Sequence, residues 1–394
     1  MSVRINFHVS PGGTLRGRLR VPGDKSISHR ALMLGAIARG ETRISGFLQG
    51  EDALATMAAL RAMGVAIDHQ EEKALVHGVG LFGLQRPPSS LDLGNSGTST
   101  RLLAGLLAGQ SFDSELIGDA SLTQRPMLRV VEPLRRMHAD ISCTTAGTLP
   151  IRIHGGKKLA AIDYALPVAS AQLKSCLLLA GLYADGTTCV HEPSPTRDHT
   201  ERMLLHFGGK LTRKEQTVCI TGGGELSAAD ITVPGDISSA AFFMAGACMS
   251  PGADITLQGI GVNPARTGII RILRAMGADI SLTNEHVISG EPVADIRVRS
   301  APLHGIEIPV ELVPAAIDEF PAILVAAATA AGRTVLRGAA ELRFKESDRI
   351  MAVTEGLQAM GILCNAYADG MEVHGGRISG GTVNSYTDHR IAMA

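Results

Sequence analysis

The stretch Pro22–Gly40, PGDKSISHRALMLGAIARG, places a polar turn before a run of small apolar residues that ends at a glycine. These are the start and stop signals of a helix, which we predict from Ser26 to about Ala38. Free N–H groups and the positive end of the helix dipole favour an anion at the first turn, where Lys25 and Arg30 add full charges. The stretch therefore predicts an apolar helix that offers basic side chains to an anion at its start.

Five similar phrases indicate that the chain is built from an internal repeat. Each phrase reads as the end of an amphipathic helix, a Gly or His at its C-terminal cap, and an alternating strand. Successive copies lie about 70 to 84 residues apart, which suits a βαβαββ unit and is too long for a helical hairpin. The phrases are LRAMGVAI from Leu60, LRRMHADI from Leu134, LLHFGGKL from Leu204, LRAMGADI from Leu273 and LQAMGILC from Leu357.

The first helix of each unit begins at a polar turn, and six such helix starts are visible. They are GDKSISHR, GNSGTSTR (Gly94–Arg101), VASAQLKS (Val168–Ser175), GDISSA (Gly235–Ala240), IDEFPA (Ile317–Ala322) and TDHR (Thr387–Arg390). The sixth unit has only begun when the sequence ends at Ala394, so we expect the natural protein to be longer by roughly 40 residues.

Apolar helices repeated in this way cannot all face water, so we predict an α/β protein with two domains. Each domain would hold three units, with helices inside and sheets as walls. The first domain is expected to cover 23–235, and the second to combine 1–22 with 236–394. The phrase VPGD occurs at both boundaries, where a hinge would lie. The polar turns of both halves would then meet in a cleft.

Composition narrows the class of protein. The 37 basic and 38 acidic residues balance, so no overall field attracts nucleic acid or an anionic membrane. The longest apolar runs fall short of the roughly 18 residues of a membrane span, and no apolar signal region opens the chain. We expect a cytoplasmic monomer without nucleic-acid or membrane partners. Six scattered cysteines without a C-x-x-C pair are expected to be buried reduced thiols, neither disulfides nor zinc ligands.

Basic residues accumulate in or beside the Gly/Ser/Pro-rich turns, which favours a bound anion over ordinary helix caps or solvated arginines. Nucleotide motifs do not explain the set, because the Walker A spacing fails at GDKS and no G-x-G-x-x-G follows a strand. Metal-ligand spacings are also absent, so we expect neither metal nor cofactor. The basic residues are Lys25, Arg30, Arg101, Arg125, Arg197, Lys345, Arg349 and Arg390.

Eight ordered motifs spread over essentially the whole chain resemble those of the 5-enolpyruvylshikimate-3-phosphate synthase family, in its bacterial class with NSGT in the second motif. They are PGDKSISHR, LGNSGTSTRLLAGLL, LTQRPM, ASAQLKS, TRDHTERML, IDEFPA, LRFKESDR and DHRIAMA. The resemblance implies the enolpyruvyl transferase fold, an inside-out α/β barrel of six repeats, here with the sixth incomplete. It also implies a transferase of aromatic amino-acid biosynthesis, the target of glyphosate. Such enzymes move the enolpyruvyl group of phosphoenolpyruvate to the 5-hydroxyl of shikimate-3-phosphate and release phosphate.

Three alternatives stay open. The UDP-N-acetylglucosamine enolpyruvyl transferases share the fold, but their signatures, including a loop cysteine, are not found. A binding-only repeat protein would hold anions without turnover. An RNA 3′-phosphate cyclase would need a nucleotide site and a nucleophilic histidine, and its motifs are absent.

The resemblance also implies roles for individual residues. The catalytic residues are Asp318 as the base at the hydroxyl, Glu346 as the proton donor, and Lys25, which shares the acid role. The residues that hold shikimate-3-phosphate are Lys25, Ser26, Arg30, Ser170, Ala171, Gln172, Arg197, Asp318 and Lys345. The residues that hold phosphoenolpyruvate are Lys25, Gly97, Thr98, Arg125, Gln172, Arg349 and Arg390.

Both catalytic carboxylates also have an ordinary interpretation. Asp318 suits the N-cap of the helix that follows it, and Glu346 suits a surface pair with a neighbouring Lys345 or Arg349. Cations nearby would depress the pKa of Glu346, so it would need substrate charge or a relay to carry a proton. Ala171 and Glu341 depart from the family pattern, where Ser and Asn are common, and put one contact each in doubt.

Overall fold

Helix α1 (Lys25–Ile37) forms where the polar turn and the apolar run predict it, and Asp24 caps it by accepting the N–H of Ile27. Its residues from Ile27 to Ile37 are all buried. A helix without a polar stripe is stable only when other elements surround it. The same holds for α3 (Gly97–Ala108) and α5 (Ala171–Gly181), which are buried over most of their length. These helices therefore lie inside the protein.

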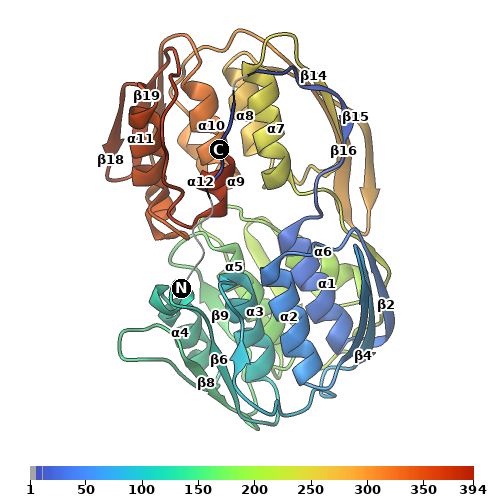
Figure 1. The fold of residues 1–394 in the computed structure, drawn as a ribbon. Helices are drawn as coiled ribbons and strands as arrows, with labels where there is room; N and C mark the ends of the chain where they lie inside the picture. Colours follow the sequence, from blue (N-terminus) through green and yellow to red (C-terminus); the bar gives the residue numbers. More distant parts are fainter. Residues whose placement is uncertain (1–5, 11) are drawn as a thin grey trace.

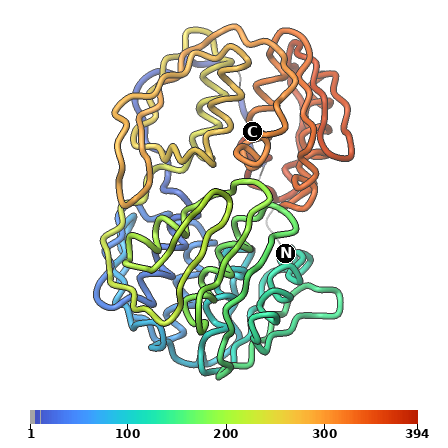
Figure 2. Tube along the Cα trace, turned by 180° about the vertical axis from the view of Figure 1, so that it is seen from behind, coloured from blue at the N-terminus to red at the C-terminus, as the bar shows by residue number. Residues whose placement is uncertain are grey.

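The computed structural model describes residues 6–10 and 12–394. Figures 1 and 2 show two lobes: one holds the chain from α1 through green, and the other holds the yellow-to-red part together with the dark-blue segment that contains β1 (Arg16–Leu19). The other helices of the first lobe are α2 (Glu51–Ala62), α4 (Leu128–Arg136) and α6 (His199–His206). The helices of the second lobe are α7 (Ile237–Met249), α8 (Gly268–Ala275), α9 (Val313–Ala316), α10 (Phe320–Ala327), α11 (Arg349–Ala359) and α12 (His389–Met393).

Three sheets formed by the described residues make the walls of the first lobe, and each has one outer strand parallel to its neighbour and an antiparallel meander. The first contains β13 (Ile231–Thr232), β2 (Arg39–Ser45), β4 (Lys73–Val79) and β3 (Ala66–Gln70), in that order. The second contains β5 (Leu91–Asp92), β6 (Ser114–Ile117), β8 (Ile151–His154) and β7 (Asp140–Ser142). The third contains β9 (Asp163–Ala165), β10 (Thr187–His191), β12 (Thr217–Thr221) and β11 (Leu211–Lys214).

The second lobe repeats this plan within the described part of the chain. Its larger sheet contains β1 (Arg16–Leu19), β14 (Asp254–Gly261), β16 (Glu291–Arg299) and β15 (Asp279–Ile288). Its smaller sheet contains β17 (Arg333–Leu336), β19 (Gly370–His374) and β18 (Cys364–Tyr367), and parallel bridges from His304 and Glu307 occupy the outer position. The recurring order explains the period of the sequence repeat, since each unit supplies one small sheet and the helices beside it.

The outer strands of the first and fourth units are exchanged between the lobes. Strand β1 directly precedes α1 in the sequence but runs parallel to β14 in the second lobe, which supports the proposed assignment of 1–22 to the second domain. Strand β13 takes the vacated position, parallel to β2. Both VPGD phrases cross between the lobes, and the N–H of Asp24 donates to the carbonyl of Pro234 (2.8 Å) while that of Asp236 donates to Pro22 (2.9 Å). The blue segment that leads to α1 can be followed between the lobes in Figure 1.

Buried apolar side chains of the described residues form two separate clusters. One lies between Ile27 and Val233, and the other joins Val21 to residues between Ile237 and Ile391. These clusters support the proposed division into domains at 23–235 and at 1–22 with 236–394. Residues 1–5 and 11 of the second domain lie outside the described residues.

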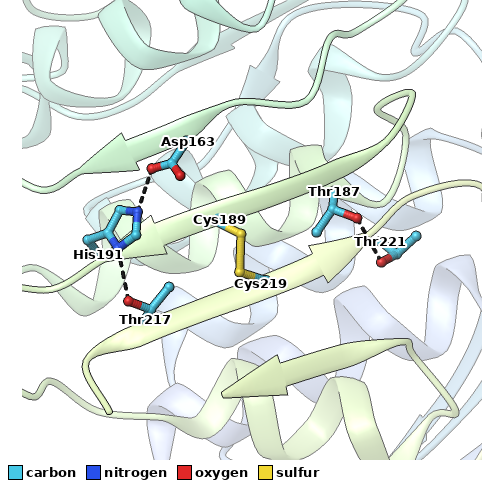
Figure 3. Close-up of a disulfide and its surroundings, with 7 residues drawn as sticks. All are labelled: Asp163, Thr187, Cys189, His191, Thr217, Cys219 and Thr221. Carbon is cyan, nitrogen blue, oxygen red and sulfur yellow. Dashed lines mark hydrogen bonds and ion pairs between the residues drawn. A yellow bond between two sulfur atoms is a disulfide. The ribbon is translucent and has the colours of Figure 1, made fainter. Parts of the chain in front are cut away.

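The expectation that all cysteines are reduced is wrong for one pair, because Cys189 and Cys219 form a disulfide. The two residues lie directly opposite each other on the antiparallel strands β10 and β12, with Cα atoms 4.1 Å apart (Figure 3). They are 30 residues apart in sequence, so no short sequence motif predicts their pairing. Strand register alone brings the sulfur atoms together. The remaining cysteines are free, as expected; Cys176, Cys248 and Cys364 are also buried as expected, whereas Cys143 is only half-buried.

Candidate active site

Asp318 lies just before α10 and is surrounded by cations from both domains. Its carboxylate pairs with Arg197 (2.5 Å), Lys345 (3.5 Å) and Arg349 (3.4 Å). Its backbone carbonyl accepts a hydrogen bond from Arg390 (3.2 Å). Burial would raise the pKa of Asp318, but the surrounding cations outweigh it and hold the pKa well below its ordinary value of 3.8. The carboxylate is therefore ionised and can accept a proton when a ligand takes over these cations.

The alternative role of Asp318 as a helix cap does not hold. Glu319 occupies the N-cap position of α10, and no side chain caps the helix there. The Asp318 carboxylate instead faces Arg197 of the first domain, 121 residues away in the sequence.

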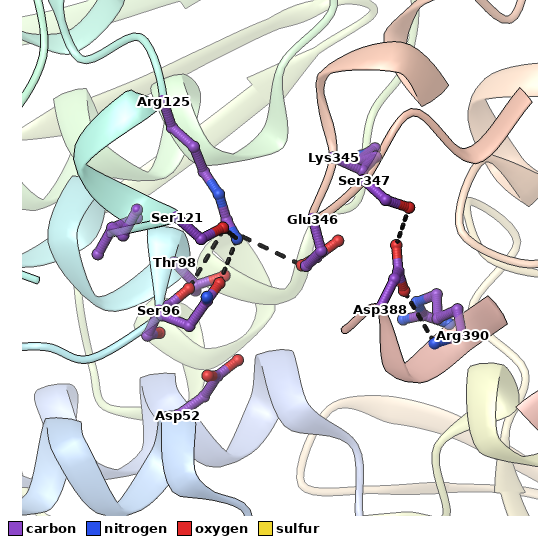
Figure 4. Close-up of polar contacts among 12 residues, drawn as sticks. Asp52, Ser96, Thr98, Ser121, Arg125, Lys345, Glu346, Ser347, Asp388 and Arg390 are labelled. Carbon is purple, nitrogen blue, oxygen red and sulfur yellow. Dashed lines mark hydrogen bonds and ion pairs between the residues drawn. The ribbon is translucent and has the colours of Figure 1, made fainter. Parts of the chain in front are cut away.

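Glu346 lies opposite Asp318 on the loop before α11 and contacts the first domain. It pairs with Arg349 (2.5 Å) and approaches Arg125 of the first domain (4.0 Å). Figure 4 shows Arg125 and Glu346 pointing toward each other. Burial would raise the pKa of Glu346, but Arg349 and then Arg125 lower it to about 2. Arg349 is only 2% exposed, so this is not the surface pair that the sequence also allows.

Arg125 and Gln172 form the first-domain side of this cluster. Arg125 donates to the carbonyl of Asn95 (3.2 Å) and to its side-chain oxygen. Gln172 donates to the hydroxyl of Thr98 (3.0 Å) and accepts from Arg101 (2.5 Å). The NSGT turn thus holds both the arginine and the amide that the sequence assigns to the site.

Gly97 lies between two of these cations at the start of α3. A Cβ at this position would be 3.0 Å from Nη1 of Arg101 and 3.3 Å from Nη1 of Arg125. Only glycine leaves both guanidinium groups undisturbed. Glycine is therefore favoured here by the limited space for a side chain, not by a positive φ angle.

Lys25, at the start of α1, pairs through Nζ with Asp52 (2.9 Å), a residue of α2 that we did not predict for the site. Burial would raise the pKa of Asp52, but Lys25 outweighs it, and the pKa lies below the ordinary value. The positive charge of Lys25 also contributes, after the arginines, to the low pKa of Glu346. Lys25 therefore belongs to the same electrostatic cluster although it contacts Asp52 directly.

Arg30 is placed differently from the other cations, because oxygen atoms of its own domain already hold it. Its guanidinium donates to the carbonyl of Ser26 (2.9 Å) and to the hydroxyls of Ser175 (2.8 Å) and Thr200 (2.6 Å). Burial lowers its pKa to about 10. Arg30 has further N–H groups for a ligand, but it lies behind Ser26 rather than among the residues around Asp318.

Ser170 and Ala171 are set by the start of α5. The hydroxyl of Ser170 accepts the N–H of Leu173 (3.3 Å), and Ala171 is the first helical residue. Ser170 is therefore a helix cap. Its hydroxyl oxygen accepts the N–H of Leu173, and its O–H can still donate a hydrogen bond to a ligand.

Several residues of the cluster were missing from the sequence prediction. Asp388 is fully buried and accepts from Nε of Arg349 (2.9 Å) and from Ser347 (3.0 Å). Asp52 and Asn95 position Lys25 and Arg125 as described above. Asp388 and Asp52 both lie at helix starts, where acidic residues are common for other reasons. Their sequence positions therefore carry no separate signal.

Metal binding is not indicated by the side chains in the described part of the chain. No group of three or more His, Cys, Asp and Glu residues among 6–10 and 12–394 is arranged to hold a metal ion. The site instead consists of cations paired with ionised carboxylates. Its cations can form charge-assisted hydrogen bonds with multiply anionic organic substrates.

Comparison with known proteins agrees with this chemistry. The family model of EPSP synthase (3-phosphoshikimate 1-carboxyvinyltransferase) matches residues 9–394. A 3-phosphoshikimate 1-carboxyvinyltransferase of Methylococcus capsulatus is 62% identical over 391 residues, covering 99% of this chain and 90% of that relative. The corresponding protein of Coxiella burnetii is 55% identical over 392 residues, with 99% and 89% covered. A solved EPSP synthase of Acinetobacter baumannii superimposes with a TM-score of 0.88 at 53% identity, covering 97% of this chain and 89% of that one.

The architecture, the order of the motifs and the cation–carboxylate cluster thus lead to one assignment, as the resemblance predicted. The chain belongs to the EPSP synthase family, the 3-phosphoshikimate 1-carboxyvinyltransferases, and has the inside-out α/β fold of the enolpyruvyl transferases.

Proposed function

We propose that the chain performs the reaction of its family, the transfer of the enolpyruvyl group of phosphoenolpyruvate to the 5-hydroxyl of shikimate-3-phosphate with release of phosphate. The observation that carries the proposal is the position of two ionised carboxylates, Asp318 and Glu346, among cations from both domains. Both substrates are multiply anionic, and they would replace the carboxylates as partners of these cations.

We propose a shikimate-3-phosphate subsite along the starts of α1, α5 and α6. The cations of this subsite would bind the phosphate and carboxylate, while hydroxyl and amide groups read the ring oxygens. Arg197 and Lys345 support this assignment because both are held by Asp318, the residue proposed to meet the reacting hydroxyl. The subsite residues are Lys25, Ser26, Arg30, Ser170, Ala171, Gln172, Arg197, Asp318 and Lys345.

We propose that phosphoenolpyruvate binds next to it, between the NSGT turn and the start of α11. Planar carboxylates and phosphates suit the paired N–H groups of arginine. Arg125 and Arg349 lie on opposite sides of Glu346 and would bind the ligand from the two domains. The subsite residues are Lys25, Gly97, Thr98, Arg125, Gln172, Arg349 and Arg390.

The reaction needs a base at the 5-hydroxyl of shikimate-3-phosphate and an acid at C3 of phosphoenolpyruvate. In the addition step, Asp318 accepts the proton of the 5-hydroxyl as its oxygen bonds to C2 of phosphoenolpyruvate, and Glu346 gives a proton to C3. In the elimination step, C3 returns a proton to Glu346 as the C2–O bond to phosphate breaks, and the proton held by Asp318 leaves with the released phosphate. Both carboxyl groups thus return to their starting states, and no redox partner takes part in the step.

The experiment that tests the proposal is a phosphate-release assay with each substrate omitted in turn. Release that requires both phosphoenolpyruvate and shikimate-3-phosphate is expected. Turnover with UDP-N-acetylglucosamine in place of shikimate-3-phosphate would refute the proposed acceptor substrate. Ligand binding without any phosphate release would instead make it a binding protein, and tight RNA binding at about 0.2 M salt would favour the cyclase.

We also propose that the protein works as a monomer in the cytoplasm, without nucleic-acid or membrane partners. The balanced charge of the sequence supports the absence of a nucleic-acid partner. Across residues 6–10 and 12–394, no helix has the length and apolar character that crossing a membrane requires. Sedimentation velocity of the purified protein would test the oligomeric state.

A further inference from the structure

The two segments that cross between the lobes meet at a buried arginine. Arg266 lies between β14 and α8 and is 3% exposed. Its Nη1 donates to the carboxylate of Asp24 (2.9 Å), on one crossing segment. Its Nη2 donates to the carboxylate of Asp236 (3.0 Å), on the other, and to the hydroxyl of Ser238 (2.7 Å). One planar guanidinium therefore joins both crossings from the side of the second domain.

The same guanidinium reaches the segment that carries Asp318. Glu319 is fully buried, and its carboxylate lies 3.7 Å from Nη2 of Arg266. Ser238 donates a hydrogen bond to Glu319, so a second path joins the same two groups. Glu319 is also the N-cap residue of α10, and its position therefore fixes how the chain enters that helix.

Two of the three carboxylates held by Arg266, those of Asp24 and Glu319, belong to residues next in sequence to a group proposed for catalysis. Asp24 caps α1 and precedes Lys25, whose backbone N–H also donates to Asp236 (3.4 Å). Glu319 follows Asp318. Lys25 belongs to the first domain and Asp318 to the second, so the network connects the two halves of the site at the point where the domains join.

Stability alone does not account for this network. A buried charge cluster is often replaced by apolar residues without loss of stability, whereas it can specify a unique geometry. Within the described residues, neither Nε of Arg266 nor Oε2 of Glu319 has a hydrogen-bond partner, so the cluster is not the best-satisfied arrangement available. Its distinctive property is that three carboxylates from three chain segments meet a single rigid fork.

We propose that Arg266 is a positioning residue for the enolpyruvyl transfer. Its guanidinium binds the carboxylates of Asp24 and Glu319. Their chain neighbours, Lys25 and Asp318, are thereby held at a set separation across the two domains. This inference rests on the proposed function, because the separation matters only if both groups act on one pair of substrates.

The test is the substitution Arg266→Lys, assayed in the full chain by phosphate release at a temperature below the melting transition. Lysine keeps the charge but cannot bind two carboxylates in a fixed plane. We expect kcat to fall about 10- to 100-fold, because a small misplacement of reacting groups has effects of that size. KM for both substrates should change less than kcat, since the binding cations other than Lys25 remain in place. The matched control is Arg297→Lys, which disturbs a surface fork to Asp254 (2.9 and 2.7 Å) and should leave kcat unchanged.

The outcomes separate the inference from the function on which it rests. Parental kcat in folded Arg266→Lys, or an equal loss in Arg297→Lys, overturns the positioning role while leaving the transferase activity of the parent in place. A parent that releases no phosphate with both substrates overturns the proposed function and the inference with it. If circular dichroism shows that Arg266→Lys does not fold, Glu319→Gln takes its place. A loss confined to kcat then supports the role, and parental kcat overturns it.

Discussion

Replacing Glu346 with glutamine separates its charge from its size, and the structure predicts that substrate affinity and turnover change in opposite directions. The pKa of Glu346 is about 2 instead of its ordinary 4.5, because the charges of Arg349 and Arg125 outweigh burial, which would raise the pKa. That difference corresponds to about 3 kcal/mol. At neutral pH only about one molecule in 10⁵ carries a proton there. A ligand must therefore draw the arginines away before Glu346 can act as an acid.

With glutamine at this position, less free energy is needed to draw the arginines away, because the amide is neutral and binds them less strongly. We expect KM for phosphoenolpyruvate to fall in Glu346→Gln, by at most about 150-fold for the full 3 kcal/mol. We expect kcat to fall by about 10² to 10⁴, the usual contribution of a general acid. Initial rates of phosphate release, with shikimate-3-phosphate saturating, measure both constants.

The matched control is Glu115→Gln. It removes the charge of a carboxylate in β6 that pairs with Arg152 of β8 (2.7 Å) and belongs to neither proposed subsite. Both of its constants should equal those of the parent. A parental kcat in Glu346→Gln would show that Glu346 is not the proton donor. A raised KM would refute the electrostatic reasoning, because it would mean that the ionised carboxylate helps the anionic substrate to bind.

Three other predictions follow from the same contacts, together with a pH dependence. Asp318→Asn should lower kcat by about 10² to 10⁴ without raising KM for shikimate-3-phosphate, and equal changes in both constants would contradict its role as a base. Gly97→Ala should raise KM for phosphoenolpyruvate about 5- to 30-fold, equivalent to about 1 to 2 kcal/mol, because its Cβ crowds Arg101 and Arg125, while thermal stability is retained. Thiol titration of the denatured, unreduced protein should count four thiols, not six, and reduction should cost about 3 to 4 kcal/mol for the 30-residue separation. The stabilisation from Glu346, whose folded pKa is depressed, should be present above pH 4.5 and disappear as the pH falls through about 2. The melting temperatures of the parent and of Glu346→Gln should therefore converge in acid, and a constant difference would contradict this.

Local patterns in the sequence predicted the features that a few neighbouring residues decide. The turn before α1 can be recognised because the start signals of a helix depend on residues a few positions apart, although the structure identifies Asp24 as the capping residue. The absence of a polar stripe in PGDKSISHRALMLGAIARG predicted a buried helix, and the repeat predicted the recurring sheets. The cations of the site were found for the same reason, since each lies in a turn that can be read on its own.

Tertiary structure alone decided which of these groups meet. Arg197 and Asp318 are 121 residues apart, and Asp24 and Arg266 are 242 apart, so no local spacing relates them. The disulfide between β10 and β12 and the position of β13 beside β2 depend on strand pairing in the same way, whereas the sequence already assigned residues 1–22, which contain β1, to the second domain. The local conformation of the helix starts and turns depends on sterics and hydrogen bonds between neighbouring residues. It can therefore be predicted from the sequence. The pairing of distant charges, and hence the depressed pKa values of Asp318 and Glu346, required the two domains to be placed against each other.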